Sequence, residues 1–370
     1  MTQSTPHTVP AQAGPQPLPK PGIMDIKPYV GGEGRMDVVK NPVRLASNEN
    51  VLGCSPKARE AYLAAAGDLH RYPDGAAAEL RAILGKTYGI DADHIVCGAG
   101  SDELISLIVR AYAGAGDEVL YSQYGFLMYP ITAKAVGATP VAAPETDMRT
   151  DVDAVLANVS PKTKVVLIAN PNNPTGSYLN KTEMQKLRDG LPSDVLLVVD
   201  AAYAEFVDAP DYEDGSTLVA AGNNTVMLRT FSKIYGLAAV RLGWGYFPPE
   251  VAGVINRVRG AFNVSAPAQA AGIAALADQD FLQKTIDMTA NGRTQLTTGL
   301  QSMGFKVWPS VTNFVLVEFG DKAEDIRLAL KAQGIFIRQM GAYNLPKCLR
   351  ITVGTKDDNA RLLAAAKAFV

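Results

Sequence analysis

The sequence predicts an α/β protein in which a large, doubly wound, mostly parallel sheet is joined to a smaller α+β domain. From about Ser55 onward, short apolar runs rich in β-branched residues alternate with segments of helical length. This alternation is typical of parallel strands connected by crossover helices. After Phe262 it gives way to a long helical stretch and then to a region with fewer strands. A chain of 370 residues is long enough for two such domains.

The first part of the chain carries the signals of the large sheet. Ser55 and Pro56 are typical of a helix start, because serine caps the first turn and proline suits its first position. Ser101 begins another helix, with acidic residues in its first turn. Strands are expected at His94–Cys97, Glu118–Tyr121, Lys164–Ile168, Val195–Val199 and Thr225–Leu228.

The last part of the chain indicates the smaller domain. A helical stretch is expected from Ala266 to Met303, with a break near Asp278–Asp280. Strands are expected at Phe314–Glu318, Ile335–Arg338 and Cys348–Val353, and helices at Ala323–Gln333 and Lys356–Ala368. We therefore divide the chain into a flexible proline-rich arm (1–27), a segment that accompanies the small domain and the functional site (28–54), a large domain (55–275) and a small domain (276–370).

Composition excludes several classes of protein. The formal net charge is -2 and the basic residues are scattered, so neither a nucleic-acid surface nor a basic membrane-binding helix is expected. The apolar runs are too short to span a bilayer, and the N-terminus lacks the apolar stretch of a signal peptide. Three cysteines and three histidines lie far apart, which predicts neither disulfides nor a metal site. Free thiols favour the cytoplasm.

Lys233 is the first residue whose setting indicates chemistry. It follows a predicted strand in the segment Thr230–Leu237, which reads TFSKIYGL. A lysine that is partly removed from water has a lowered pKa and attacks aldehydes more readily. Ser232 and Arg241 are suited to hold a phosphate, Arg241 through its planar guanidinium group. A solvated surface lysine is the alternative, which a Ser-Lys pair alone would favour.

Two polar segments follow predicted strands at the ends where open α/β sheets bind ligands. The run Asn170–Gly176, NPNNPTG, indicates a tight turn from which an asparagine could donate to a phenolate oxygen. Asp200 ends an apolar run, and a buried carboxylate needs a partner. A protonated pyridine nitrogen would be such a partner and would make the ring an electron sink. The alternatives are an ordinary turn and an aspartate that caps a helix.

The loop Cys97–Glu103, CGAGSDE, places glycines before a predicted helix, where backbone N–H groups bind anions. It differs from a dinucleotide fingerprint because Glu103 occupies the position of the third glycine. In addition, Asp117 and Glu118 come before the next strand, whereas an acid that binds ribose would follow it. We interpret the loop as a site for a single phosphate group.

Arginines occur in the apolar strand regions near the C-terminus. Arg350 lies within the run Cys348–Val353, and Arg338 lies upstream of it. An arginine in an apolar strand needs an anionic partner, which a substrate carboxylate or phosphate would provide. A structural salt bridge is the alternative, and this segment alone leaves the two open.

Together these motifs resemble the fold-type I pyridoxal-phosphate enzymes of the aspartate aminotransferase superfamily, from about Pro28 to the C-terminus. Within it they are most similar to the histidinol-phosphate aminotransferase family. The segments that carry the resemblance are Leu45–Asn50, His70–Gly75, Gly98–Leu104, Asn170–Gly176, Thr230–Arg241, Phe262–Pro267 and Gly341–Gly354. The chain departs from the family in having Val51 where proline is usual, and Gln123 where a proline often precedes the aromatic residue.

The resemblance implies pyridoxal 5′-phosphate as the cofactor and a role for each residue around it. Lys233 would hold the cofactor as a Schiff base, and Asp200 would pair with the pyridine nitrogen. The other cofactor contacts implied are Asn173 and Tyr203 at the phenolic oxygen, Tyr124 stacked on the ring, and the amides of Ser101 and Asp102 with Ser232 and Arg241 at the phosphate.

The resemblance also implies how substrate and subunits are arranged. Arg338 and Arg350 would bind the anionic end of the substrate, and Asn48 would also contact the substrate. Tyr29 lies where the family's N-terminal arm covers the substrate. Tyr72 would reach the phosphate bound by a neighbouring subunit, which implies a homodimer with shared sites.

The implied activity is a cytoplasmic ping-pong transamination in histidine biosynthesis, with L-histidinol phosphate as donor and 2-oxoglutarate as acceptor. Lys233 would move the proton of the substrate's Cα. The alternatives are an aromatic amino-acid aminotransferase, a decarboxylase on the same scaffold, and an idle regulatory protein that binds the cofactor. A nicotinamide dehydrogenase fits worst, because the glycine pattern fails.

Overall fold

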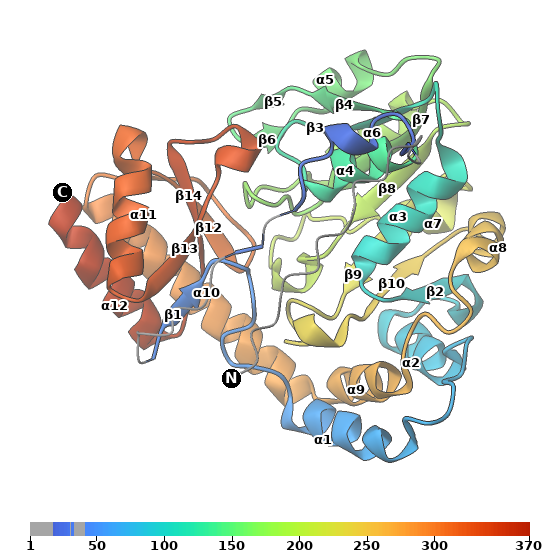
Figure 1. The fold of residues 1–370 in the computed structure, drawn as a ribbon, viewed down its shortest axis with the longest axis horizontal. Helices are drawn as coiled ribbons and strands as arrows, with labels where there is room; N and C mark the ends of the chain where they lie inside the picture. The colour runs from blue at the N-terminus through green and yellow to red at the C-terminus, as the bar shows by residue number, and fades with distance from the viewer. Residues whose placement is uncertain (1–17, 30, 33–40) are drawn as a thin grey trace, which may run out of the picture.

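The computed structural model describes residues 18–29, 31–32 and 41–370, which form two sheets with helices packed around each (Figure 1). The larger sheet has seven strands in the order β2-β10-β9-β8-β7-β3-β4. Its strands are β2 (Ile95–Gly98), β3 (Glu118–Ser122), β4 (Thr139–Ala143), β7 (Thr163–Ala169), β8 (Leu196–Asp200), β9 (Thr225–Thr230) and β10 (Gly243–Tyr246). All neighbouring pairs are parallel except those of β10, which runs antiparallel to both β2 and β9.

Helices cover both faces of this sheet. One face packs against α3 (Ser101–Tyr112), α4 (Met128–Ala135) and α8 (Pro249–Val258). The other face packs against α2 (Ala78–Tyr88), α5 (Val152–Ala157), α6 (Lys181–Gly190), α7 (Ser216–Ala221) and α9 (Ala266–Ala277), and α1 (Pro56–Ala65) lies against α9. Because both faces are covered, the central strands β8 and β9 are buried along their whole length.

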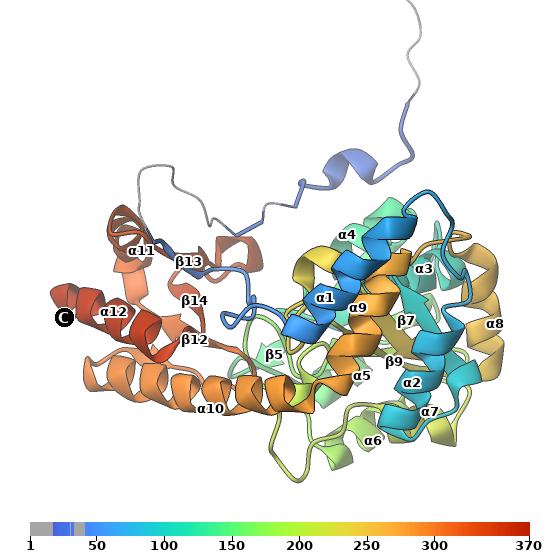
Figure 2. The ribbon, with the colours of Figure 1, turned by 90° about the horizontal axis from the view of Figure 1, so that it is seen from below.

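The smaller sheet has five strands in the order β1-β13-β14-β12-β11. Its strands are β1 (Val43–Leu45), β11 (Lys306–Val307), β12 (Phe314–Glu318), β13 (Ile335–Gln339) and β14 (Cys348–Thr352). Only the β1–β13 pair is parallel. One face packs against α10 (Gln279–Ser302), α11 (Ala323–Ala332) and α12 (Lys356–Ala366). Figure 2 shows α10 running from the large sheet's helices to the small sheet.

The structure confirms most of the expected elements and adds strands that were not expected. The long helical stretch breaks at Asp278 into α9 and α10, as expected. The strands that were not expected are β1, β4, β10 and β11, together with a short hairpin of β5 (Glu145–Thr146) and β6 (Arg149–Thr150). The sequence of β10 is GWGY and that of β4 contains proline, so both carry weak strand signals.

The proline-rich arm is described only in part, because residues 1–17 lie outside the described residues. Within residues 18–29, the short 3₁₀ helix Ile23–Asp25 lies against α4, where the Lys134 amine donates to the Asp25 carbonyl at 3.4 Å. Over the described part of the chain, no helix combines the length and the apolar character needed to cross a membrane.

Candidate active site

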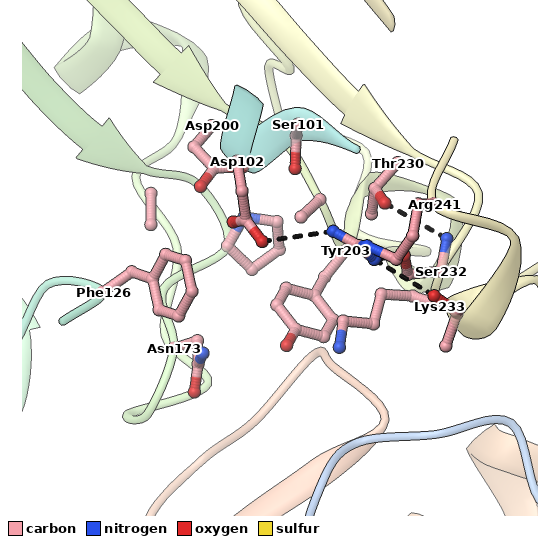
Figure 3. A pocket seen from close by; sticks show the side chains of 14 residues that line it. Ser101, Asp102, Phe126, Asn173, Asp200, Tyr203, Thr230, Ser232, Lys233 and Arg241 are labelled. Atoms are coloured by element: carbon pink, nitrogen blue, oxygen red, sulfur yellow. Dashed lines mark hydrogen bonds and ion pairs between the residues drawn. The ribbon is translucent and has the colours of Figure 1, made fainter. Parts of the chain in front are cut away.

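Two adjoining pockets lie between the carboxyl ends of the large sheet's strands and the small sheet. We call the first the aspartate pocket (Figure 3); its side chains include Ser101, Asp200, Ser232 and Arg241. We call the second the arginine pocket; its side chains include Tyr29, Asn48, Arg338, Tyr343 and Arg350. Both are lined by Asp102, Phe126, Asn173, Tyr203 and Lys233. The two pockets therefore form one cavity around Lys233, which all the predicted site residues except Tyr72 and Tyr124 line.

Asp200 is the last residue of β8 and is 6% exposed. Its Oδ2 accepts a hydrogen bond from the Tyr129 hydroxyl at 2.9 Å, whereas its Oδ1 is buried and has no hydrogen-bond partner among the described residues. Burial raises the pKa of Asp200 to about 6, although the hydrogen bond from Tyr129 favours the ionised form. A buried carboxylate oxygen without a donor is costly, so this atom indicates a missing ligand group that carries an N–H or O–H.

Lys233 follows β9, in a loop that the N-terminal segment holds in place. The Asn50 side chain donates to the carbonyl of Ile234 at 2.9 Å. Gly236 has φ 67°, and a Cβ there would lie 1.9 Å from the carbonyl oxygen of Gly53, so only glycine fits. The Lys233 amine lies 5.7 Å from the centre of the Tyr203 ring.

The surroundings of Lys233 make its amine easier to deprotonate. Burial, followed by the nearby positive charge of Arg350, lowers the pKa of Lys233 from 10.5 to about 8. About a tenth of the amine is therefore neutral at pH 7, and the neutral form is the nucleophile and the base. The sequence analysis expected a lysine partly removed from water here, and its role in the reaction stays a prediction.

The far end of the aspartate pocket is a cradle for an anion. Helix α3 begins at Ser101, and no side chain caps its N-terminus. The preceding Gly100 has φ 91°, and a Cβ there would lie 2.4 Å from a guanidinium nitrogen of Arg241. The same guanidinium donates to the Ser232 hydroxyl at 3.4 Å and pairs with the Asp102 carboxylate at 3.4 Å (Figure 3). Helix N–H groups, a serine hydroxyl and an arginine together suit a phosphate.

The arginine pocket holds a buried guanidinium without an acidic partner. Arg350 is 7% exposed, donates to the Asn173 side chain and to the Ala46 carbonyl at 3.0 Å, and has an unpaired buried Nε. No carboxylate pairs with it among the described residues. Burial lowers the pKa of Arg350. Within the described part of the chain, this guanidinium therefore makes no structural salt bridge, which was the alternative left open by the sequence.

Arg338 lies directly opposite Arg350 in the β13–β14 ladder, so both side chains project from the same face of the sheet. The Arg338 guanidinium lies 6.0 Å from the centre of the Tyr29 ring. Both guanidinium groups line the arginine pocket, so they can approach the same bound group.

Tyr203 and Asn48 join the two pockets across the chain. The Asn48 side chain donates to the Tyr203 hydroxyl at 3.0 Å, and its backbone N–H donates to Thr352 at 3.0 Å. Tyr203 is 4% exposed and packs edge-on against Phe314 at 5.3 Å. Burial raises the pKa of Tyr203 to about 12, so its hydroxyl stays protonated near neutral pH. The hydroxyl can therefore both accept from Asn48 and donate to a ligand oxygen.

The aromatic residue at the cavity wall differs from the one that the sequence indicated. Phe126 lines both pockets, whereas Tyr124 lines neither and packs against a buried cluster of Leu316, Met340, Tyr343, Leu345 and Cys348. Tyr129, which the sequence did not single out, hydrogen-bonds to Asp200 from α4. The segment from Tyr124 to Tyr129 contains three aromatic residues. The residue at which α4 begins determines which of them faces the cavity.

Tyr72 lies outside both pockets of this chain. It is 82% exposed and stacks on Phe262 with 4.5 Å between ring centres. Tyr72 and Phe262 thus form an exposed aromatic pair on the surface, and Leu69, three positions before Tyr72, is also exposed.

The chain was compared with known proteins. Residues 40–366 match the family model described as aminotransferase class I and II. The histidinol-phosphate aminotransferase of Rhodospirillum centenum is 56% identical over 341 residues, which cover 91% of this chain and 94% of the relative. The protein of the same name from Paramagnetospirillum magneticum is 54% identical over 358 residues, covering 96% and 99%.

Solved structures agree with this likeness. The histidinol-phosphate aminotransferase of Sinorhizobium meliloti, solved in complex with pyridoxal 5′-phosphate, superposes with a TM-score of 0.84 at 33% identity. The match covers 88% of this chain and 90% of that chain. A Thermus thermophilus aspartate aminotransferase shares the fold alone, with a TM-score of 0.79 at 19% identity. The predicted fold class, a fold-type I arrangement with a mostly parallel doubly wound sheet, is confirmed.

Proposed function

The chain belongs to the class I and II aminotransferases, and we propose that it transfers the amino group of L-histidinol phosphate to 2-oxoglutarate in histidine biosynthesis. The single observation that carries the proposal is the joint cavity. Its inner half offers a reactive lysine and a buried carboxylate, and its outer half offers two facing arginines. An amino substrate with an anionic end fits such a cavity.

The cofactor is pyridoxal 5′-phosphate, and the aspartate pocket fits it. The free Oδ1 of Asp200 would accept from a protonated pyridine nitrogen, and the cradle of Ser101, Ser232 and Arg241 would hold the phosphate. Lys233 would attach to the aldehyde through its neutral amine. When bound, the cofactor supplies an electron sink for the negative charge that forms at the substrate's Cα.

The remaining aspartate-pocket residues would orient the ring. Asn173 and the protonated Tyr203 hydroxyl are placed to meet its phenolic oxygen. Phe126 replaces Tyr124 in our assignment of the residue that covers the ring face, because Phe126 lines the pocket. Asp102 contributes its backbone N–H at the start of α3, and its side chain pairs with Arg241.

Lys233 would also move protons during the reaction. Its amine lies where the two pockets meet, so it borders both the cofactor site and the substrate site. With a pKa near 8, the amine would accept a proton from the substrate's Cα and would later give a proton back. Both steps need the same group, first as a base and then as an acid.

Arg338 and Arg350 would bind the phosphate end of the donor and a carboxylate of the acceptor. A phosphate dianion suits two facing guanidinium groups better than a neutral aromatic ring does. Asn48 and Tyr29 border the same pocket and would contact the substrate. The carboxylate of an aromatic amino acid would suit the same arginines, so the choice of histidinol phosphate is supported by the relatives named histidinol-phosphate aminotransferase.

We also propose that the enzyme is a cytoplasmic homodimer with shared sites. The exposed pair of Tyr72 and Phe262 offers a surface that a second copy would cover, bringing the Tyr72 hydroxyl to the partner's phosphate. We also propose that the chain divides into its parts after residues 27, 54 and 275. The strands of the small sheet come from both ends of the chain.

The visible spectrum of the purified enzyme tests the proposal. L-histidinol phosphate is added without a keto acid, and the absorbance of the lysine-bound cofactor should bleach as that of the amine form rises. Bleaching by phenylalanine or tyrosine but not by histidinol phosphate would move the substrate to the aromatic class. Release of carbon dioxide when an amino acid such as phenylalanine or tyrosine is added would indicate a decarboxylase, because histidinol phosphate has no carboxyl group to lose. Absence of any lysine-bound absorbance would refute the role of Lys233.

A further inference from the structure

Tyr129 lies behind the active site rather than in it. Its side chain comes from α4, is fully buried at 0% exposure, and lines neither the aspartate pocket nor the arginine pocket. Its hydroxyl donates to Oδ2 of Asp200 at 2.9 Å. Among the described residues it is the only side chain that hydrogen-bonds to this carboxylate, and Oδ1 is left free.

The Tyr129 hydroxyl is a donor at every working pH. Burial, and then the negative charge of Asp200, raise the pKa of Tyr129 well above that of an ordinary tyrosine. A neutral hydroxyl bonded to a carboxylate stabilises the ionised form of that carboxylate. Among the other groups near Asp200, Asp102 disfavours its ionisation, whereas the backbone N–H of Ala202 and the amine of Lys233 favour it. The negative charge of Asp200 also raises the pKa of the nearby Tyr203.

Tyr129 also supports the side chain at the face of the cavity. Its ring meets that of Phe126 edge-on, with 5.9 Å between centres and 87° between planes. At Gly125 a Cβ would lie 3.2 Å from the Tyr129 ring, so the chain passes close to it here. One buried residue therefore contacts both Asp200, at the inner edge of the pocket, and Phe126, at its wall.

We propose that Tyr129 is a positioning residue that keeps Asp200 ionised and directs its free Oδ1 toward the pyridine nitrogen of the cofactor. The hydroxyl holds one carboxylate oxygen, so rotation of the carboxylate is restrained and the other oxygen remains aimed into the pocket. This inference rests on the proposed function, because it concerns how the chain orients Asp200, the carboxylate that would bind the cofactor's ring nitrogen.

The test compares Tyr129→Phe with Tyr121→Phe in the full-length enzyme loaded with pyridoxal phosphate. Tyr121 lies on β3, edge-on to the Tyr129 ring at 6.3 Å, and makes no hydrogen bond to Asp200 among the described residues, so it controls for loss of a nearby hydroxyl. Tyr129→Phe should lower kcat about ten-fold, the usual worth of a hydrogen bond to a charged group, with little change in KM. Tyr121→Phe should leave both unchanged.

Two further readouts separate positioning from packing. Without the hydroxyl, Asp200 becomes harder to ionise, so the acidic limb of the kcat profile should move to higher pH, and the pH midpoint of the cofactor's visible absorbance should also shift. The dissociation constant of pyridoxal phosphate should rise several-fold in Tyr129→Phe. A packing defect alone would lower thermal stability without moving either pH profile.

A double-mutant cycle with Asp200→Asn gives the sharpest outcome. In that background the hydroxyl has no ionised partner, so Tyr129→Phe should change the half-reaction rate by less than two-fold. An additional ten-fold loss there, or pH profiles in Tyr129→Phe that coincide with those of Tyr121→Phe, would overturn the inference. A wild-type enzyme without lysine-bound cofactor would instead refute the proposed function, so the two failures are distinguishable.

Discussion

The two pockets that meet at Lys233 are built in different ways. The aspartate pocket is formed at the carboxyl ends of strands of one sheet: Asp200 ends β8, Lys233 follows β9, and Ser101 begins the helix after β2. The arginine pocket is assembled from distant parts of the chain. Its bonds join Asn48 to Tyr203 and Arg350 to Ala46, across 155 and 304 positions of sequence.

The difference teaches which part of the site is fixed by local structure and which part by the packing of the two sheets. The carboxyl ends of parallel strands converge whatever the side chains are, so the aspartate pocket follows from the topology. The arginine pocket exists only when the N-terminal segment and the small sheet dock on the large one. We expect substitutions in the aspartate pocket to affect the chemical step, and those in the arginine pocket to affect substrate binding.

Lys233→Ala is the strongest test, because Lys233 serves both pockets. Loss of the base and of the covalent anchor should lower kcat by roughly 10⁴-fold and abolish the lysine-bound absorbance. Equilibrium dialysis should still detect pyridoxal phosphate, held by the phosphate cradle and Asp200. Multiple turnovers at an appreciable rate in this variant would contradict the assignment of the base.

Arg350→Ala tests the arginine pocket. Removal of a buried charged donor should lower kcat/KM for histidinol phosphate by about 100-fold, mainly through KM, because about 3 kcal/mol is lost with such a group. Arg293→Ala is the matched control, since Arg293 is a largely buried arginine that bonds to the Thr312 carbonyl and lines neither pocket. If Arg350→Ala lost the cofactor but kept its substrate affinity, the contrast between the pockets would be wrong.

The same contrast explains how much of the site could be predicted from sequence. Asp200 and Lys233 follow apolar runs directly, so the local pattern places them at strand ends. Phe126 and Tyr129 were missed because the resemblance pointed to Tyr124, which lies two and five positions before them, and no pattern in this segment shows which aromatic ring faces the cavity. The contact between Arg350 and Asn173 was beyond prediction, because it joins two sheets whose docking no spacing encodes.

The fold shows a similar limit. The alternation of strands and helices predicted the parallel sheet, because each apolar run is buried on both faces. The antiparallel strand β10 was missed, since its glycines weaken the pattern and its place beside β9 comes from the turn at Arg241. Trp244 on this strand is 1% exposed, so tertiary packing rather than propensity keeps the strand in the sheet.

The pH dependence of cofactor attachment tests whether the pockets communicate. Only the neutral amine attacks the aldehyde, so the attachment rate of apoenzyme should rise about ten-fold per pH unit and level off near pH 8 rather than 10.5. Arg350 contributes to this lowering, so Arg350→Ala should move the midpoint to higher pH. Stopped-flow absorbance measures both midpoints. Identical midpoints would mean that the charge of Arg350 does not change the pKa of Lys233.

Asp102→Asn should have the smallest effect, and its sign is informative. The Asp102 carboxylate lies 3.4 Å from the Arg241 guanidinium, and both side chains are about half exposed (45% and 47%), so the pair itself contributes little stability. When the cofactor's phosphate binds the same guanidinium, the carboxylate competes for it and repels the phosphate. Neutralising it should therefore tighten pyridoxal phosphate binding by at most a few-fold, less at high salt. Weaker binding, measured by fluorescence titration of the apoenzyme, would instead mean that the Asp102 side chain holds Arg241 in the position that the phosphate needs.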